Sequence, residues 1–165
     1  MEEIFAKPAV AAIIEKEENG VKYILIQERQ KENGGIENGM LEIPAGKIRE
    51  YENIYDTLRR EVWEETGLLV TDIVGEENLI TREVNGYKTL SFTPFCSTQN
   101  LSGGYSIVVQ TFICHASGEL LDETNETKNL RFVTLPECKQ LMQSDEASFY
   151  PMHLNGLYQY IKMNQ

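Results

Sequence analysis

One stretch of the chain, residues 46–68, constrains the fold more than any other. It contains the clearest helical pattern in the sequence, because three apolar residues recur at every fourth position and so share one helix face. Asn53 is a preferred residue type at a helix N-terminus, and Gly67 is a common residue type just after a helix ends. The sequence therefore predicts a helix over residues 53–66 with one buried face. The apolar residues of that face are Ile54, Leu58 and Val62.

Three glutamates, Glu61, Glu64 and Glu65, lie at the carboxyl end of this expected helix. At about 100° per residue, Glu61 and Glu65 fall beside the apolar face, and Glu64 falls further round the helix. Two ionised carboxylates beside a core face lose hydration and repel each other unless a cation neutralises them. Oxygen ligands favour Mg²⁺ or Mn²⁺ over zinc, and a chain whose histidines are His115 and His153 alone offers no histidine-based site. The sequence therefore predicts a divalent cation at this helix end.

The segments before this helix have the pattern of strands. Residues 8–14 and 21–27 are apolar and rich in β-branched residues, and the polar turn between them contains an Asn-Gly pair, which is a strong hairpin signal. A polar, glycine-rich loop is expected over residues 31–39. A short apolar strand that ends at a proline is expected over residues 40–44.

The segments after the helix alternate between strand and helix patterns. Residues 68–95 are strand-like and contain a second hairpin turn at Asn85-Gly86. Two later helical segments each open with a proline, which the first helical turn tolerates. Strands that alternate with a few helices favour a mixed α/β layer fold. The later elements expected are strands over residues 106–114 and 130–135 and helices over residues 136–143 and 151–163.

The composition excludes several classes of protein. Hydrophobic residues make up 41% and charged residues 25% of 165 residues, which are values typical of soluble globular proteins. No repeat, low-complexity tract or linker interrupts the chain, so we expect a single domain over residues 1–165. The formal net charge of −11 repels nucleic acids and anionic membrane surfaces, and we therefore expect neither as a partner.

The cysteines and the N-terminal residues indicate the compartment. Three cysteines are an odd number without metal-binding spacing, so reduced thiols in a reducing compartment are expected. The first residues carry acids where a signal peptide carries bases. The longest purely apolar run, residues 9–14, is too short to cross a bilayer. The expected location is therefore the cytoplasm.

The residues around the acid cluster follow a known pattern. Gly46 is followed by five residues and Glu52, and then by seven residues and the segment Arg60-Glu-Val-Trp-Glu-Glu-Thr-Gly-Leu68. This spacing resembles the signature of the Nudix hydrolases, G-x5-E-x7-R-E-U-x-E-E-x-G-U, in which U is apolar. Every fixed position is met over residues 46–68, and chance agreement is on the order of 10⁻⁹ per window from average residue usage.

The resemblance implies a fold and a reaction. The fold would be the Nudix α/β/α sandwich, with a mixed β-sheet between helices and the signature forming a catalytic loop-helix-loop. The reaction would be hydrolysis of a nucleoside diphosphate linked to another moiety, with Mg²⁺ or Mn²⁺ as the cofactor. Metal ions can neutralise the charge of a diphosphate and activate a water molecule for attack.

Site residues follow from the resemblance position by position. Glu61 and Glu65 would be the main metal ligands. Glu64 would be a further ligand, either directly or through a bound water molecule. The carbonyl oxygen of Ala45 would be a backbone ligand.

Four other signature residues have structural roles by the same resemblance. Arg60 and Glu52 would form an ion pair that holds the loop against the helix. Gly46 and Gly67 would allow backbone turns that a side chain would block.

The base that accepts a proton from the attacking water has three candidates. In many Nudix relatives it belongs to a loop beyond the signature, and residues 118–129 form such a loop here. Glu123 and Glu126 lie in this loop, just before the expected strand over residues 130–135. Glu64, inside the signature, is the third carboxylate that a water molecule could reach.

The substrate class depends on residues outside the signature. The lead-in Leu41-Glu-Ile-Pro-Ala-Gly-Lys47 resembles the branch that cleaves ADP-ribose and nucleotide sugars. A proline that this branch carries about sixteen residues after its signature is displaced here, because Val84 stands in that place and the nearest proline is Pro94. The candidate substrate-binding residues are Arg29 and Lys47 for the phosphates and Tyr105 for stacking on a base.

Three function classes remain after these observations. The first is an Mg²⁺-dependent pyrophosphatase acting on ADP-ribose or a nucleotide sugar. The second is an enzyme of the same fold acting on nucleoside triphosphates or dinucleoside polyphosphates. The third is a non-catalytic Nudix sensor that binds a nucleotide, and the complete set of acids argues against it. A homodimer is also expected, both from the resemblance and because Trp63 falls off the apolar helix face.

Overall fold

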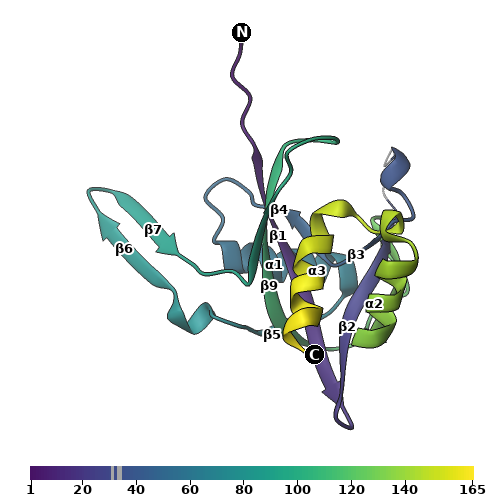
Figure 1. The fold of residues 1–165 in the computed structure, drawn as a ribbon. Coiled ribbons are helices and arrows are strands. Elements are labelled where there is room, and N and C mark those ends of the chain that lie inside the picture. Colours follow the sequence, from purple (N-terminus) through teal and green to yellow (C-terminus); the bar gives the residue numbers. More distant parts are fainter. Residues whose placement is uncertain (31, 33–34) are drawn as a thin grey trace.

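The computed structural model describes residues 1–30, 32 and 35–165 of the chain. A large mixed sheet lies between helices, and a separate hairpin projects to one side (Figure 1). The strands of the large sheet are β1 (Lys7–Glu18), β2 (Val21–Arg29), β3 (Leu41–Glu42), β4 (Ala45–Lys47), β5 (Leu69–Ile73), β8 (Cys96–Gln99), β9 (Ile107–Ser117) and β10 (Thr127–Thr134). The hairpin consists of β6 (Ile80–Val84) and β7 (Tyr87–Ser91), and the helices are α1 (Ile54–Thr66), α2 (Leu135–Ser144) and α3 (Pro151–Met163).

Strand β1 is the centre of the large sheet. The strand order is β10-β2-β1-β9-β5, with β3 paired to β2, β4 paired to β1 and β8 paired to β9. β1 and β9 run parallel, and β2 and β4 are antiparallel to β1. A strand covered on both faces needs a continuous apolar run, which explains why every residue from Ala9 to Ile14 is buried.

Two hydrophobic cores form on the two faces of this sheet. Successive side chains of a strand point to opposite faces. The odd-numbered residues of the Ala9–Ile14 run pack in one core with α2 and α3, and the even-numbered residues pack in the other core with α1. The predicted α/β fold, with a mixed sheet between helices, is thereby confirmed.

Helix α1 begins and ends as its sequence predicts. The side chain of Asn53 accepts a hydrogen bond from the backbone N–H of Tyr55 at 2.9 Å, which satisfies one of the free donors of the first turn. Gly67 has a φ of 78°, and its N–H donates to the carbonyl of Trp63. Any other residue type would be strained at this φ, so the helix ends here.

Several element boundaries differ from those expected. The expected strand over residues 40–44 is shorter, as β3, and a further strand, β4, begins directly after Pro44. The expected strand over residues 130–135 begins earlier, as β10, and contains a bulge where Asn129 has a φ of 51°. Of the expected loop over residues 31–39, residues 31, 33 and 34 lie outside the described part, and residues 35–37 form a short 3-10 turn.

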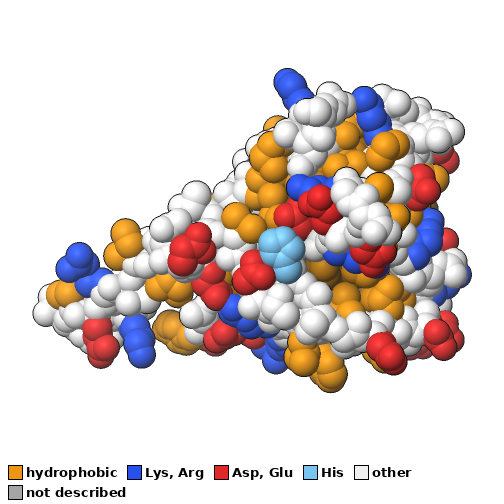
Figure 2. Space-filling model, turned by 90° about the horizontal axis from the view of Figure 1, so that it is seen from below, with side chains coloured by type: hydrophobic (Ala, Val, Ile, Leu, Met, Phe, Trp, Pro, Cys, Tyr) orange, Lys and Arg blue, Asp and Glu red, His pale blue; other side chains and the backbone are white. Residues whose placement is uncertain are grey.

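The β6–β7 hairpin projects away from the rest of the molecule, at the left of Figures 1 and 2, and we call it the arm. The predicted Asn85-Gly86 turn joins its two strands. All of its strand residues are exposed except Leu90, which is half-buried. Among the described residues, no helix is long and apolar enough to cross a membrane.

Candidate active site

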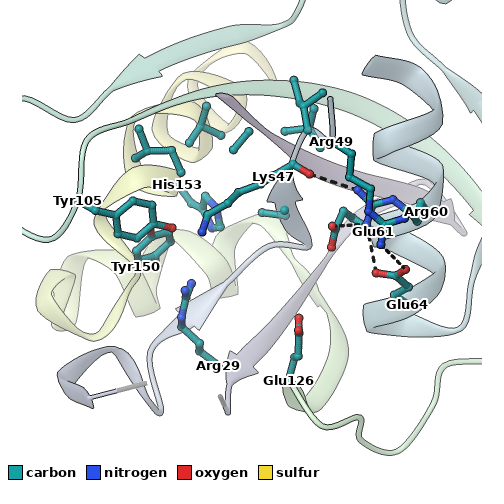
Figure 3. A pocket seen from close by; sticks show the side chains of 17 residues that line it. Arg29, Lys47, Arg49, Arg60, Glu61, Glu64, Tyr105, Glu126, Tyr150 and His153 are labelled. Atoms are coloured by element: carbon teal, nitrogen blue, oxygen red, sulfur yellow. Dashed lines mark hydrogen bonds and ion pairs between the residues drawn. The ribbon is translucent and has the colours of Figure 1, made fainter. Parts of the chain in front are cut away.

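A cavity of about 520 Å³ lies beside the N-terminal half of β1, between α1 and α3 (Figure 3). Its wall comes from elements far apart in the sequence, namely β1, β2, β4, α1, β9, α3 and the loops before β9 and β10. One end is acidic and the other is aromatic and cationic. The acidic end contains Glu61, Glu64 and Glu126, and the aromatic end contains Arg29, Lys47, Tyr105, Tyr150 and His153.

The three glutamates of α1 lie in different surroundings. Glu61 is 9% exposed and Glu65 is 2% exposed, whereas the side chain of Glu64 is 49% exposed. This difference follows from their angles around the helix, since Glu61 and Glu65 lie next to the buried stripe. Glu61 and Glu64 line the cavity, and Glu65 is buried behind its wall.

Arg60 connects the loop before α1 to the acids on α1. Its Nε and Nη2 donate to the two oxygens of Glu52 at 2.8 and 2.9 Å, which is a bidentate pair. Its Nη1 donates to Glu61 at 2.6 Å and to Glu64 at 3.3 Å, and its Nη2 also reaches the carbonyl of Lys47 at 3.2 Å. The hydrogen bonds from Arg60 lower the pKa of Glu52 from 4.5 to about 2. The guanidinium therefore holds the loop and the carboxylates in one arrangement.

Gly46 lies directly against the carboxyl group of Glu61. A Cβ at position 46 would be 2.0 Å from Cδ of Glu61 and 2.3 Å from each of its oxygens. No side chain fits there unless the carboxylate moves. At the other end of α1, a Cβ at Gly67 would be 2.7 Å from the side chain of Leu121.

Glu65 is held by two hydrogen bonds inside the protein. Its Oε2 accepts from the backbone N–H of Ala45 at 3.0 Å and from Nε2 of Gln27 at 3.1 Å. Burial raises the pKa of Glu65 well above its usual value, and the nearby carboxylate of Glu42 raises it further. Burial also raises the pKa of Glu61, although the bond from Arg60 opposes that rise.

The loop before β10 brings one of its two candidate acids to the cavity. The loop is attached to the end of α1, since Oγ1 of Thr127 donates to the carbonyl of Glu65 at 2.8 Å and the N–H of Leu121 donates to Thr66 at 3.0 Å. Glu126 lines the cavity opposite Glu61 (Figure 3). Glu123 is exposed, accepts from Nε2 of Gln30 at 3.2 Å, and is not among the described residues of the cavity wall.

The aromatic end is built around stacked cations. The guanidinium of Arg29 lies 4.6 Å from the ring centre of Tyr150, and Nζ of Lys47 lies 5.1 Å from that of Tyr105. His153 meets the ring of Tyr150 edge-on at 5.0 Å between ring centres. Contacts of this kind stabilise a cation beside a ring face.

Two of the sequence-predicted substrate residues, Lys47 and Tyr105, line the cavity. Lys47 lies over the ring of Tyr105 and forms no salt bridge with any described residue. The third, Arg29, is already engaged. Its guanidinium pairs with Glu42 at 3.0 Å and with Glu37 at 3.3 Å, and its side chain is 10% exposed. Much of its charge is therefore neutralised inside the protein.

Sequence reasoning missed Gln27, Glu42, Tyr150 and His153. Gln27 lies within a strand and carries no local motif, Glu42 lies in the lead-in before the signature but was not assigned a role, and the other two lie at the start of α3, far along the chain from the signature. The folded sheet brings Tyr150 and His153 to the cavity wall and Gln27 and Glu42 behind it. The proline that opens α3 was the one nearby signal, and it predicts the helix start but not the cavity.

The donor set of the acidic end suits a hard divalent cation. Among residues 1–30, 32 and 35–165, no three acidic, histidine or cysteine side chains lie close enough to form a metal site as they stand. In this arrangement Arg60 binds Glu61, and Ala45 and Gln27 bind Glu65. Burial raises the pKa values of Glu61 and Glu65, so their ionised forms are unfavourable here. A bound Mg²⁺ would stabilise these ionised forms.

Solved structures share this fold. A NUDIX hydrolase from Nitrosomonas europaea matches with a TM-score of 0.63 and 19% identity, over 94% of this chain and 88% of that chain. The NUDIX domain of Shewanella oneidensis NrtR, complexed with ADP ribose, matches with a TM-score of 0.60 and 14% identity, over 84% and 79%. A C. elegans Ap4A hydrolase matches with a TM-score of 0.54 and 12% identity, over 96% and 99%.

The family assignment comes from the sequence itself. No curated protein matches the chain. The sequence does match the NUDIX domain family over residues 6–152, which is most of its length and includes the whole signature. Members of this family act on small nucleotide substrates and generally use divalent metals such as Mg²⁺. The chain therefore belongs to the NUDIX family and is a Nudix hydrolase.

Proposed function

We propose that this enzyme cleaves the diphosphate bond of a nucleoside diphosphate derivative, with ADP-ribose or a nucleotide sugar as its substrate. The observation that carries the proposal is the division of one cavity into an acidic end and an aromatic end. A diphosphate held at the acidic end leaves a base or a sugar to be bound at the other. Aromatic rings suit a base, and nearby polar groups suit sugar hydroxyls.

The acidic end would hold the cofactor. Glu61, Glu64, Glu65 and the carbonyl of Ala45 are the proposed ligands for Mg²⁺ or Mn²⁺. When bound, the metal supplies charge neutralisation for the diphosphate and polarises the attacking water. The role of Arg60 is to keep these acids in place through Glu52 and Glu61.

Glu126 is the proposed general base. It lines the cavity near Glu61, and its loop is tied to the end of α1, so its carboxylate is held at the end where the diphosphate is proposed to bind. Glu126 would accept a proton from water as the water oxygen bonds to phosphorus and the bridging P–O bond breaks. The products are a nucleoside monophosphate and a sugar phosphate. Glu64 is the second candidate for this role, and Glu123 is disfavoured because it lies outside the cavity wall described above.

The aromatic end would bind the rest of the substrate. Tyr105 and Tyr150 offer ring faces, and Lys47 extends between them and the acidic end (Figure 3). Arg29 would act mainly by supporting Tyr150, because Glu42 and Glu37 already neutralise its charge.

The alternative is cleavage of a nucleoside triphosphate or a dinucleoside polyphosphate. The fold is also that of MutT proteins and of an Ap4A hydrolase. A longer polyphosphate has more charge to neutralise, and the described residues of the cavity wall offer few cations besides Lys47, Arg49 and the already paired Arg29 and Arg60. This favours a diphosphate. A non-catalytic sensor is the weakest alternative, since every acid of the signature is present.

A substrate panel tests this proposal. ADP-ribose, UDP-glucose, the four ribonucleoside triphosphates and diadenosine tetraphosphate would be assayed at equal Mg²⁺ and pH, with the nucleotide products separated and quantified by ion-exchange chromatography. The kcat/KM for ADP-ribose or the nucleotide sugar should exceed that for every triphosphate. A higher value for a triphosphate or for diadenosine tetraphosphate would replace the proposed substrate with that class.

We also propose that two copies of the chain associate through the arm. A two-stranded hairpin alone is marginally stable in water, and one face of the arm exposes Ile80, Val84 and Tyr87. Light scattering should give a dimer mass for the wild-type chain and a monomer mass when Ile80 and Tyr87 are both changed to Ser. A monomeric wild-type chain at micromolar concentration would remove this proposal.

The proposed compartment is the cytoplasm. Cys96, Cys114 and Cys138 all carry free thiols. Burial raises the pKa of Cys114 and of Cys138 to about 12, so both are unreactive core residues that suit a reducing environment.

A further inference from the structure

A connected set of polar side chains is buried behind the wall of the cavity. It begins at Arg29, passes through Glu42 and Gln27, and ends at Glu65, and none of the four is more than 8% exposed. Arg29 and Gln27 lie two residues apart on β2 and so point to the same face of the sheet, and Gln27 is directly opposite Glu42 of β3. The set therefore joins the aromatic end of the cavity to the acidic end.

The side-chain amide of Gln27 lies between two carboxylates. Its Nε2 donates to Oε2 of Glu65 at 3.1 Å and to Oε1 of Glu42 at 3.4 Å. The other oxygen of Glu42 accepts from Arg29 at 3.0 Å. One neutral amide thus supplies a donor to each of two acids that would otherwise repel each other across a buried gap.

Packing alone does not explain a glutamine at this position. Gln27 is fully buried, and it follows Ile24, Leu25 and Ile26 on β2, which are buried and apolar. Its Oε1 makes no hydrogen bond to any described residue, so the side chain is used here only as a donor. An apolar residue would avoid a buried polar atom without a partner. The benefit of the glutamine must therefore lie in what it donates to.

We propose that Gln27 is a positioning residue for the metal, and this rests on the proposed role of Glu65 as a ligand. Gln27 and the N–H of Ala45 both bind Oε2 of Glu65, which restricts the rotation of the carboxylate, and Oε1 would then be the ligand atom. Glu42, held by Arg29, fixes the amide in turn. Groups that orient a metal ligand commonly change metal affinity by tenfold or more when they are removed.

Mn²⁺ binding to the full, substrate-free chain tests this role without any catalytic assay. Electron paramagnetic resonance would measure free Mn²⁺ during titration of wild type, Gln27→Met and Gln110→Met. Methionine keeps the length of the side chain and removes its donor. The control, Gln110, is half-buried on β9 and accepts from Ser97 outside the cavity. The Kd should rise about tenfold in Gln27→Met and stay unchanged in the control. Equal Kd values for Gln27→Met and wild type would overturn the proposal.

A second variant covers the case in which Gln27→Met does not fold. Gln27→Asn keeps the amide and shortens the side chain by one methylene, so it cannot reach both carboxylates, and the same loss of Mn²⁺ affinity is expected. In a Glu65→Gln background, Gln27→Met should add less than a twofold further loss, because it acts through Glu65. A full additional tenfold loss would show that Gln27 acts on the fold rather than on Glu65 and would overturn the proposal.

The two proposals fail in different ways. If wild type binds Mn²⁺ and the Gln27 variants bind it more weakly, the positioning role stands whatever substrate the panel identifies. If wild type does not bind Mn²⁺, the metal site of the proposed function is wrong and the role of Gln27 falls with it.

Discussion

The two ends of the cavity are built in opposite ways. At the acidic end, Glu61 and Glu64, with Glu65 behind the cavity wall, come from five consecutive positions of one helix, and Glu126 is added by the loop before β10. At the aromatic end, Arg29, Lys47, Tyr105, Tyr150 and His153 come from strands, a loop and a helix spread over most of the chain. The first end depends on the local geometry of α1, and the second exists only when the whole sheet has formed.

The two ends also differ in electrostatics. Burial raises the pKa values of Glu61 and Glu65, so their ionised forms destabilise the metal-free fold. The cations of the aromatic end lie on rings or on carboxylates and so are stabilised in place. The buried carboxylates at the acidic end therefore lower the stability of the metal-free fold, whereas the cations at the aromatic end do not. Changes at the acidic end should alter the rate of reaction, and changes at the aromatic end should alter substrate affinity.

The largest expected effect is that of Glu65→Gln. Loss of a proposed metal ligand should lower kcat on the order of 10³-fold. The same change should raise the melting temperature of the metal-free protein. The folded pKa of Glu65 lies above its unfolded value, so ionisation at neutral pH costs stability that the neutral amide does not. Calorimetry with and without EDTA and a kcat measurement check both effects. Glu83→Gln on the exposed arm is the control, and a lower melting temperature for the metal-free Glu65→Gln protein would contradict the argument.

Glu126→Gln and Glu123→Gln form a matched pair within one loop. Glu126→Gln should lower kcat about 10²-fold, as loss of a general base does, while Glu123→Gln should leave kcat unchanged. The reason is position, since Glu126 lines the cavity and Glu123 faces Gln30 and solvent. Steady-state kinetics on the preferred substrate measures both. Equal losses in the two variants would mean that the loop acts through its fold, and loss in neither would move the base to Glu64.

Tyr105→Leu should distinguish most clearly between the proposed roles of the two ends, substrate binding and catalysis. Removing a ring that stacks on a base costs binding free energy, so KM should rise about tenfold while kcat stays within about twofold of wild type. The measurement is a full substrate titration at saturating Mg²⁺. A fall in kcat with an unchanged KM would place Tyr105 at the reacting bond and remove the division of roles between the two ends.

The smallest expected effect is a pH dependence at the edge of the acidic end. Arg60 lowers the folded pKa of Glu52 from 4.5 to about 2, so this pair stabilises the fold above pH 4.5, and the stabilisation is lost as pH falls toward 2. The melting temperature of wild type should therefore exceed that of Glu52→Gln near neutral pH, and the two should converge as the pH is lowered through that window. A gap that stays constant across the window would show that the pair contributes by packing alone.

The sequence allowed the acidic end to be predicted because its information is local. Residues three and four apart on a helix share a face, so the different burial of Glu61, Glu64 and Glu65 follows from their spacing. The cap at Asn53 and the stop at Gly67 are likewise matters of single residues and their neighbours.

The remaining features depend on tertiary contacts that spacing does not encode. The contact of Gln27 with Glu65 joins positions 38 apart, and Tyr150 reaches the cavity from the start of α3. Arg29 is an example. A cation at a strand end suggests a phosphate contact, but the sequence does not show that Arg29 pairs with the buried carboxylate of Glu42. The strand-like residues 68–95 were predicted by type, but their departure from the main sheet as an arm was not.

The parallel pairing of β1 with β9 has a consequence for synthesis of the chain. Each residue of β1 between Lys7 and Ile14 pairs with the residue one hundred positions later. On a ribosome, β1 and β2 emerge early and can form their local hairpin, but the partner that flanks β1 on its other side is made only after most of the chain. Closing so long a loop is entropically costly and slow. Helix α1 and its acids therefore leave the ribosome well before the sheet that will bury them, and a nascent chain spends that interval with its apolar central strand half-covered.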